Sequence, residues 1–194
     1  MSEEMQGNGR AAAWVAGGLA FAAVVALIFF AARSARDAQA AASFAALMPV
    51  LQSPRCMNCH RSDLPRVRDD ARKHVPKVLP ADDGAGAGGM RCAICHRATN
   101  NAITRIPGAP DWKMPPYEMS LDGLTAADIC DNWKDPAMNG GRSVGDVVKH
   151  LEHDHLVAWS WTPGEGRAKP PLSFDAFLAH ARRWVEHGAA CPSD

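Results

Sequence analysis

The pattern C-x-x-C-H occurs twice in this chain, as CMNCH at residues 56–60 and as CAICH at residues 92–96. The two thiols of such a motif can each form a thioether bond with a vinyl group of one haem. The His that follows then lies close enough to bind the iron. Two copies therefore predict two covalently bound c-type haems. The predicted attachment residues are Cys56, Cys59, Cys92 and Cys95, and the predicted proximal iron ligands are His60 and His96.

Zinc and a redox dithiol are the competing interpretations of these cysteines. Two C-x-x-C pairs separated by residues 60–91 could build an all-thiolate tetrahedral zinc site. Zinc does not require a His after each second Cys, however, and a segment for export or anchoring removes the chain from the reducing cytosol. A thioredoxin-like dithiol is disfavoured because neither motif lies in a recognisable βαβ pattern. Haem is the interpretation that we prefer.

Residues 11–32 form an apolar run without a charged side chain. At about 1.5 Å per residue, a helix of this length reaches roughly 33 Å, enough to cross the hydrocarbon core of a membrane. Secretory leaders usually have a shorter apolar region of about 7–15 residues, so an uncleaved transmembrane anchor is favoured. The alternative is a leader that is cleaved after Ala38-Gln39-Ala40.

The basic residues that flank this run do not fix its orientation. Arg10 precedes it, whereas Arg33 and Arg36 follow it, which alone would place the following domain in the cytoplasm. The C-x-x-C-H motifs decide the matter, because c-type haem is attached on the outer side of an energy-transducing membrane. Loop charge also has little influence on a long translocated domain. We expect a single-pass inner-membrane protein with its C-terminal domain in the periplasm.

The spacing of the motifs limits the number of domains. Two single-haem domains would be crowded, because the motifs begin at residues 56 and 92 of a 194-residue chain, and about 150 residues suit one domain. We expect one mainly α-helical dihaem cytochrome c domain with long loops, plus one N-terminal transmembrane helix. The predicted divisions are a cytoplasmic tail (1–10), the anchor (11–32), a juxtamembrane helix (33–52) and the periplasmic domain (53–194).

Three short helices in the C-terminal half have recognisable starts. Thr125 stands three residues before Asp128, the spacing of a capping box. Ser143 opens a second helix with an apolar face, and Ser173 opens a third at 174–187. Between these helices and the motifs the sequence predicts loops rather than strands.

Two segments predict the main loops. Residues 62–89 are polar, with several prolines and a glycine-rich run that we interpret as a flexible connection. Residues 106–117 carry four prolines and are expected to form an extended loop.

Cys130 and Cys191 are the two cysteines outside the motifs. A pair of remaining cysteines in an oxidising compartment predicts a disulfide bond. Here it would join the helix that Thr125 opens to the C-terminal tail. In the chain-entropy account a loop of this size contributes at most about 4 kcal/mol. Two separate buried thiols are the alternative.

The ligand opposite each proximal His decides whether an iron only carries electrons or also binds gas or substrate. His74 is a candidate because its segment is tethered at both ends by the motifs, and His150 because it flanks the apolar face of its helix. Met114 lies in a Met-Pro loop that resembles the ligand loop of single-haem class I cytochromes c, and Met119 is equally reachable. A thioether ligand would raise the reduction potential relative to two histidines.

Each of these residues also has an ordinary interpretation. His74 would then be a solvent-exposed loop residue, and His150 would belong to a solvated turn or to a surface metal site with its neighbouring histidines. The methionines would simply pack against a porphyrin face.

Tryptophans and basic residues accompany the motifs. We expect Trp112, Trp159 and Trp161 to pack on the haems, with ordinary core positions as the alternative. Between residues 55 and 105 there are ten Lys or Arg against five Asp. Some of these could pair with haem propionates and others could form a docking face for an acidic partner, a solvated basic loop being the simpler interpretation. Those that flank the motifs are Arg55, Arg61, Arg91 and Arg97.

Taken together, these pieces resemble a group of small dihaem cytochromes c, some of which are labelled as cytochrome subunits of isoquinoline-oxidoreductase-like molybdenum hydroxylases. The resemblance runs from about Ser53 to Pro192. It rests on SPRCMNCH, GMRCAICH, PGAPDW, NWKDPAMNGGRS, HLEHDHLVAWSWTPG and GAACP. It implies a dihaem subunit that accepts electrons from a substrate-oxidising enzyme and passes them to the respiratory chain.

These features predict an electron carrier rather than an enzyme, since no general acid–base constellation is evident. Electrons would enter from a dehydrogenase or a quinol-oxidising partner and leave to a respiratory acceptor. We expect redox proteins and a membrane as partners, and no nucleic acid. The rival interpretations are a dihaem peroxidase and a haem-based sensor, each with one open iron site. A peroxidase would also need catalytic groups above that iron, and a sensor an output module.

Overall fold

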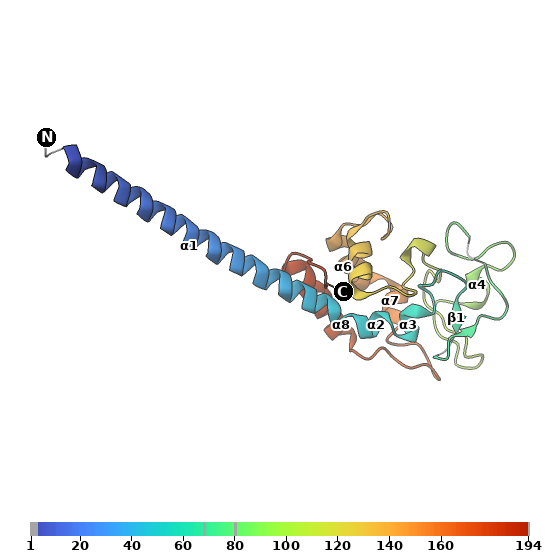
Figure 1. Cartoon of the computed structure of the whole chain (residues 1–194). Helices are drawn as coiled ribbons and strands as arrows, with labels where there is room; N and C mark the ends of the chain where they lie inside the picture. Colours follow the sequence, from blue (N-terminus) through green and yellow to red (C-terminus); the bar gives the residue numbers. More distant parts are fainter. Residues whose placement is uncertain (1–3, 68, 80, 194) are drawn as a thin grey trace.

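Helices dominate the computed structural model, which describes residues 4–67, 69–79 and 81–193. The elements in chain order are α1 (Glu4–Ala45), α2 (Met48–Leu51), α3 (Pro54–Met57), β1 (Arg66–Val67), β2 (Arg72–Lys73), α4 (Cys92–Cys95), the 3₁₀ helix η1 (Tyr117–Met119), α5 (Ala126–Lys134), α6 (Val144–His153), α7 (His155–Trp159) and α8 (Phe174–Glu186). The expectation of a mainly helical chain with one long apolar N-terminal helix is confirmed (Figure 1).

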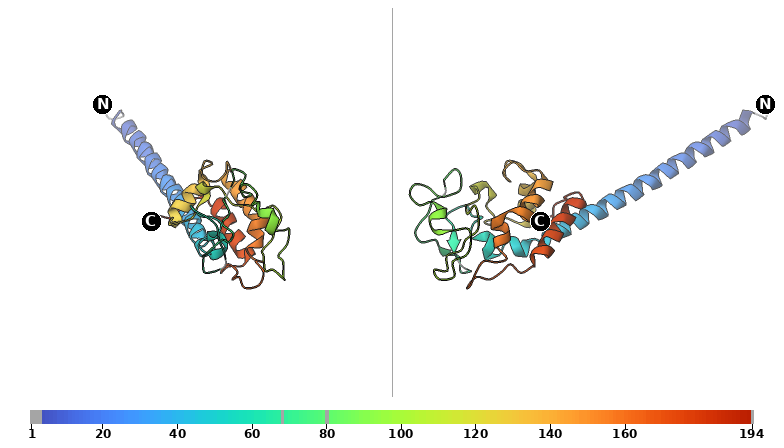
Figure 2. Two further views of the ribbon diagram at one scale, coloured as in Figure 1. Left: turned by 90° about the vertical axis from the view of Figure 1, so that its right-hand side faces the viewer. Right: turned by 180° about the vertical axis from the view of Figure 1, so that it is seen from behind.

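The helix α1 projects far beyond the folded part of the molecule (Figures 1 and 2). Its apolar side chains between Leu19 and Phe30 are exposed. By length and composition, the stretch Leu19–Leu51 is long and apolar enough to cross a membrane. The predicted anchor, residues 11–32, lies within this helix, and residues 1–3 of the predicted tail lie outside the described residues.

The C-terminal end of α1 is part of the hydrophobic core. Ala40 and Phe44 are fully buried, and the Phe44 ring meets Trp184 of α8 and Trp133 of α5 edge to face, with centroid distances of 5.1 and 5.3 Å. Leu47 continues this buried row. The segment predicted as a juxtamembrane helix therefore helps to build the domain that follows it.

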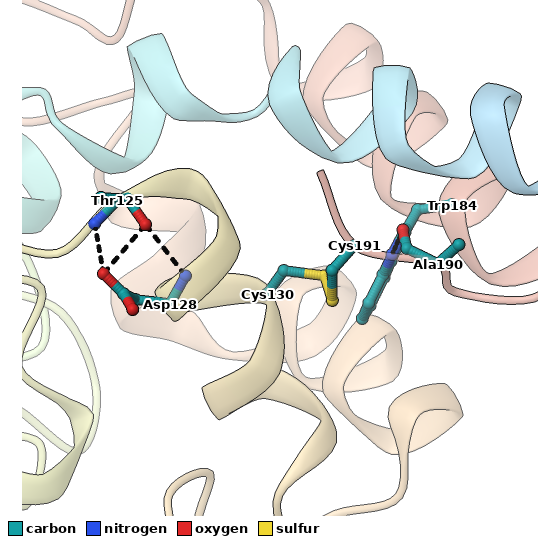
Figure 3. The surroundings of a disulfide bond; sticks show 6 residues. All are labelled: Thr125, Asp128, Cys130, Trp184, Ala190 and Cys191. Atoms are coloured by element: carbon teal, nitrogen blue, oxygen red, sulfur yellow. Dashed lines mark hydrogen bonds between the residues drawn. A yellow bond between two sulfur atoms is a disulfide. The ribbon is translucent and has the colours of Figure 1, made fainter. Parts of the chain in front are cut away.

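The three predicted helix starts are confirmed. The Thr125 hydroxyl accepts a hydrogen bond from the Asp128 amide at 3.2 Å, and the Asp128 carboxylate accepts one from the Thr125 amide at 2.9 Å, which completes the capping box (Figure 3). The hydroxyls of Ser143 and Ser173 cap α6 and α8 in the same way. Each cap satisfies an amide that the helix itself leaves without a partner.

The predicted disulfide bond between Cys130 and Cys191 is present, with the two Cα atoms 5.6 Å apart (Figure 3). It joins α5 to the C-terminal tail. Beside it, the Trp184 indole N–H donates to the carbonyl of Ala190 at 3.1 Å. The tail is thereby fixed against the same core that receives α1.

Loops fill most of the region from residue 61 to residue 116, at the end of the molecule opposite α1 (Figures 1 and 2). They include one feature that the sequence did not predict, an antiparallel ladder between β1 and β2 with Arg66 opposite Lys73. Strands of two residues are too short to show alternation in a sequence. The expected extended loop at 106–117 is observed, with η1 at its end.

Candidate cofactor-binding sites

The first motif continues directly from the core. Pro54 opens α3, and the amide of His60 donates to the carbonyl of Cys56 at 2.9 Å, so Cys56 and His60 are joined by one turn of chain. Burial raises the pKa of Cys56 to about 12 and that of Cys59 to about 11. Both thiols are therefore protonated at neutral pH, and both are free of disulfide bonds.

A second segment of chain orients His60. Its Nδ1 lies 2.9 Å from the carbonyl oxygen of Met119, and its own carbonyl accepts from the amide of Leu121 at 3.1 Å. A carbonyl can only accept, so Nδ1 carries the proton and Nε2 keeps its lone pair. Burial lowers the pKa of His60, which favours the neutral ring that binds metals.

The second motif repeats this arrangement in different surroundings. The amide of His96 donates to the carbonyl of Cys92 at 2.8 Å, and its Nδ1 lies 2.8 Å from the carbonyl oxygen of Pro107. The pKa of His96 is also lowered, first by burial. Cys92 is half-buried, however, whereas Cys95 is exposed. The two predicted proximal histidines thus have the same tautomer and the same type of acceptor.

Trp112 covers one face of the His96 ring. The two rings are stacked, with centroids 4.2 Å apart and planes 7° apart, and Trp159 meets Trp112 edge to face at 4.9 Å. The lone pair of Nε2 lies in the ring plane, so this stack leaves the metal-binding direction of His96 open. Trp161, the third tryptophan expected near a haem, instead packs on Phe174 and Phe177 in the core.

Asn100 holds the loop that carries the acceptor for His96. Its side-chain oxygen accepts from the Gly108 amide at 3.0 Å and from the Trp159 indole at 2.8 Å, and its amide nitrogen donates to the carbonyl of Thr162 at 2.8 Å. Position 108 has no room for a side chain, because a Cβ there would lie 2.2 Å from the carbonyl oxygen of Thr99. No motif or residue spacing in the sequence pointed to Asn100.

A cavity of about 500 Å³ opens beside the second motif. His96 and Trp112 line it together with small apolar side chains, among them Ala85, Ala93 and Ala109. Free thiols, a neutral imidazole with an open Nε2 and a cavity lined by small apolar side chains as well as by Arg97, Asp111 and Lys113 suit a covalently attached, flat porphyrin with charged propionates. The residues present fit such a group.

The four candidate distal ligands lie in different relations to the motifs. The His74 ring lies beside that of His96, with centroids 6.0 Å apart. His150 is half-buried in the last turn of α6, and its pKa is lowered, mainly by burial and in part by neighbouring groups that include Arg142 and His60. The backbone amide of Met114 donates a hydrogen bond to the carbonyl of Gly84 at 2.8 Å. The sequence did not indicate which motif each histidine would join.

Met119 has a role that the sequence did not predict. Its carbonyl oxygen holds His60, and its terminal methyl group lies over Gly140. A backbone acceptor carries no side-chain signature, so neither this contact nor that of Pro107 could be found from residue types alone.

The arginines that flank the motifs differ in their pairing. Arg55 is buried and pairs with Asp69, while its Nε has no hydrogen-bond partner among the described residues. Arg61 pairs with Asp122 at 3.1 Å and Arg91 with Asp83 at 2.6 Å. Arg97 is exposed and lines the cavity.

Within the described parts of the chain, no group of three or more His, Cys, Asp or Glu side chains is arranged to hold a metal ion. The four motif thiols accordingly do not form the tetrahedral cluster that the zinc alternative needs. Comparison with known proteins gives no family for the chain, because no family model, no curated protein and no solved structure matches it.

Proposed function

We propose that this protein is a dihaem c-type cytochrome that transfers electrons, of the small dihaem group that its motifs resemble. The observation that carries the proposal is the repeated geometry of the two motifs. In each, two free thiols precede a neutral His whose Nδ1 is held by a backbone carbonyl from a distant segment, at 2.9 Å for His60 and 2.8 Å for His96. Such a contact fixes the ring of a metal-binding histidine and leaves Nε2 for the metal.

Haem iron would supply reversible one-electron chemistry, and the chain would supply position and environment. Cys56 and Cys59 would hold one haem, and Cys92 and Cys95 the other. His60 and His96 would bind the irons. Trp112 and the alanines that line the cavity would pack against the second haem.

The separation of the motifs favours a relay. Cys92 contributes to the raised pKa of Cys59, after burial, so the two thiols lie within electrostatic range of each other. Haems attached to them would be close enough to exchange electrons. The first motif follows α2 at the edge of the core, and the second lies farther from α1 in the loop region, so each could face a different partner (Figure 1). We propose a dehydrogenase or a quinol-oxidising protein as donor and a respiratory carrier as acceptor.

The location follows from the same chemistry. Thioether attachment of haem and the disulfide bond between Cys130 and Cys191 both belong to an oxidising compartment. Together with the apolar N-terminal helix, they support an inner-membrane anchor with the domain in the periplasm.

A redox titration of the purified full-length protein in detergent tests this function. The expected result is a haem spectrum that changes in two one-electron steps, with electrons passing onward to an oxidised soluble cytochrome. Removing either motif, as Cys56→Ala with Cys59→Ala or as Cys92→Ala with Cys95→Ala, should leave one step. A colourless protein, or rapid turnover of hydrogen peroxide by the wild type, would contradict the proposal.

A further inference from the structure

We propose that both irons are bound by two histidines, with His74 opposite His96 and His150 opposite His60. This inference rests on the proposed function, because it assigns the remaining ligands of the two haems. It also excludes Met114 and Met119 from coordination.

The distance between His74 and His96 fits a shared metal. Two imidazoles on opposite sides of one iron each form a metal–nitrogen bond of about 2 Å, and each ring centre lies about 1 Å behind its nitrogen, so the centroids stand roughly 6 Å apart. The observed centroid distance is 6.0 Å, with the ring planes tilted by 45°. The cavity that His96 lines lies beside one of these two rings.

His74 is also held in the tautomer that a ligand needs. Its Nδ1 lies 2.7 Å from the carbonyl oxygen of Pro76, so Nδ1 carries the proton and Nε2 has the free lone pair. His60 and His96 have the same arrangement. Metal-binding histidines are regularly oriented in this way.

His150 follows the pattern at the first motif. Its Nδ1 faces a carboxylate oxygen of Asp154 at 3.5 Å, which leaves Nε2 directed elsewhere. Its side chain is 36% exposed, against 78% for His153, which lies on the outer side of the same helix. After burial, Asp154 and His60 are among the groups that shift the pKa of His150, which supports a position near the first motif.

The methionines are engaged in other contacts. Because the carbonyl of Met119 faces Nδ1 of His60, its backbone lies behind the ring, on the side away from Nε2 and the iron. The end of its side chain rests over Gly140. Met114 donates its amide to the carbonyl of Gly84 at 2.8 Å, in the loop that leads to the second motif, where His74 already takes the distal position.

Coordination by two histidines has a functional consequence. Both irons would be six-coordinate, and their reduction potentials would be lower than with a thioether ligand. Neither iron would have a free position for peroxide or a gas. The inference therefore makes the protein a carrier at both haems.

The test uses the full-length haem-loaded protein with single substitutions at the assigned and excluded ligands. The variants are His74→Ala, His150→Ala, Met114→Leu and Met119→Leu, with His153→Ala as the control from the same helix as His150. Spin state is measured by electron paramagnetic resonance of the oxidised protein, and carbon monoxide uptake per chain is measured on the reduced protein. Added imidazole serves as a rescue, because it can refill a vacated position without restoring any other function of the side chain.

The wild type, both Met→Leu variants and His153→Ala should remain low-spin and bind no carbon monoxide. His74→Ala and His150→Ala should each gain one high-spin haem and one bound carbon monoxide per chain, which imidazole reverses. When the second haem is absent, as in Cys92→Ala with Cys95→Ala, His74→Ala should have no further effect and His150→Ala should still open a site.

The inference fails if either methionine variant opens an iron, or if His74→Ala or His150→Ala leaves both haems low-spin and closed to carbon monoxide. If the proposed function is wrong, the result is different: the wild-type chain carries no covalent haem. The two outcomes are therefore distinguishable in the same preparation.

Discussion

The motif at residues 56–60 and the motif at residues 92–96 share a sequence pattern, but the protein surrounds them differently. Around the first, Ser53, Arg55 and Asn58 are buried, and α3 continues a chain segment that fills the core. Around the second, Ile94 is 55% exposed, and the motif is held by loops and by the tryptophan pair. One motif adjoins a protein-made core, whereas the other adjoins an open cavity.

This difference indicates how each site depends on its cofactor. The first region buries its apolar side chains against protein, so its stability follows that of the whole domain. The second region exposes apolar residues, among them Val75, Leu79, Met90 and Ile103, and a cofactor bound there would remove apolar surface from water. We therefore expect changes in the core to act globally and changes in the loops to act on the second haem alone.

The largest expected effect comes from opening the disulfide bond. Cys130→Ser with Cys191→Ser removes a link across 61 residues of sequence and should lower the free energy of unfolding by about 2–4 kcal/mol. Chemical denaturation followed by circular dichroism measures it. Because the bond lies in the core region, the spectrum of the second haem should not change at low denaturant. A selective change in that spectrum would show that the second site depends on the disulfide bond directly.

Gly108→Ala should affect the second haem more than the rest of the domain. A Cβ at this position meets the carbonyls of Thr99 and Arg97 at 2.2 and 2.4 Å, so the backbone must move and the acceptor for His96 moves with it. We expect this change to lower the free energy of unfolding by about 1–3 kcal/mol. The midpoint potential of the second haem should shift, and that of the first should not. Gly89→Ala is the matched control, because nothing lies within 4 Å of a Cβ there. Equal shifts for both variants would refute the role given to Gly108.

Asn100 and Asn139 form a matched pair across the two regions. Each holds a loop through three hydrogen bonds, Asn100 at the second motif and Asn139 between α5 and α6. Asn100→Ala should cost about 1–2 kcal/mol and alter the spectrum and potential of the second haem. Asn139→Ala should lower the melting temperature without that spectral change. Asn100→Asp keeps the acceptor oxygen and should have the milder effect.

The smallest expected effect is that of Thr125→Ala. It removes the capping box of α5 and should lower stability by about 1 kcal/mol. The measurement is the midpoint of denaturant unfolding, and both haem spectra should stay unchanged. A spectral change in either haem would show that α5 is coupled to the sites more closely than its contacts indicate.

The features that could be predicted from sequence are those with local causes. Thr125, Ser143 and Ser173 cap helices because of their own hydroxyls, and a charge-free apolar run predicts a long helix wherever it packs. The disulfide bond followed from counting, since Cys130 and Cys191 were the only cysteines outside the motifs. These predictions required no knowledge of the tertiary structure.

The features that could not be predicted depend on contacts between segments that are far apart in the sequence. The acceptors for His60 and His96 are backbone carbonyls from residues 119 and 107, and any residue type provides a carbonyl. Trp161 packs on Phe177 of α8, the core position that was the alternative to a place on a haem. The tether argument brought His74 near a motif but could not choose which one.

The most direct test of the central claim is the mass of the denatured, solvent-extracted chain. The account predicts that the wild type retains two haems, and that removal of either cysteine pair leaves one. A wild-type mass equal to that of the bare polypeptide, or to that of a chain with a single haem, would contradict it.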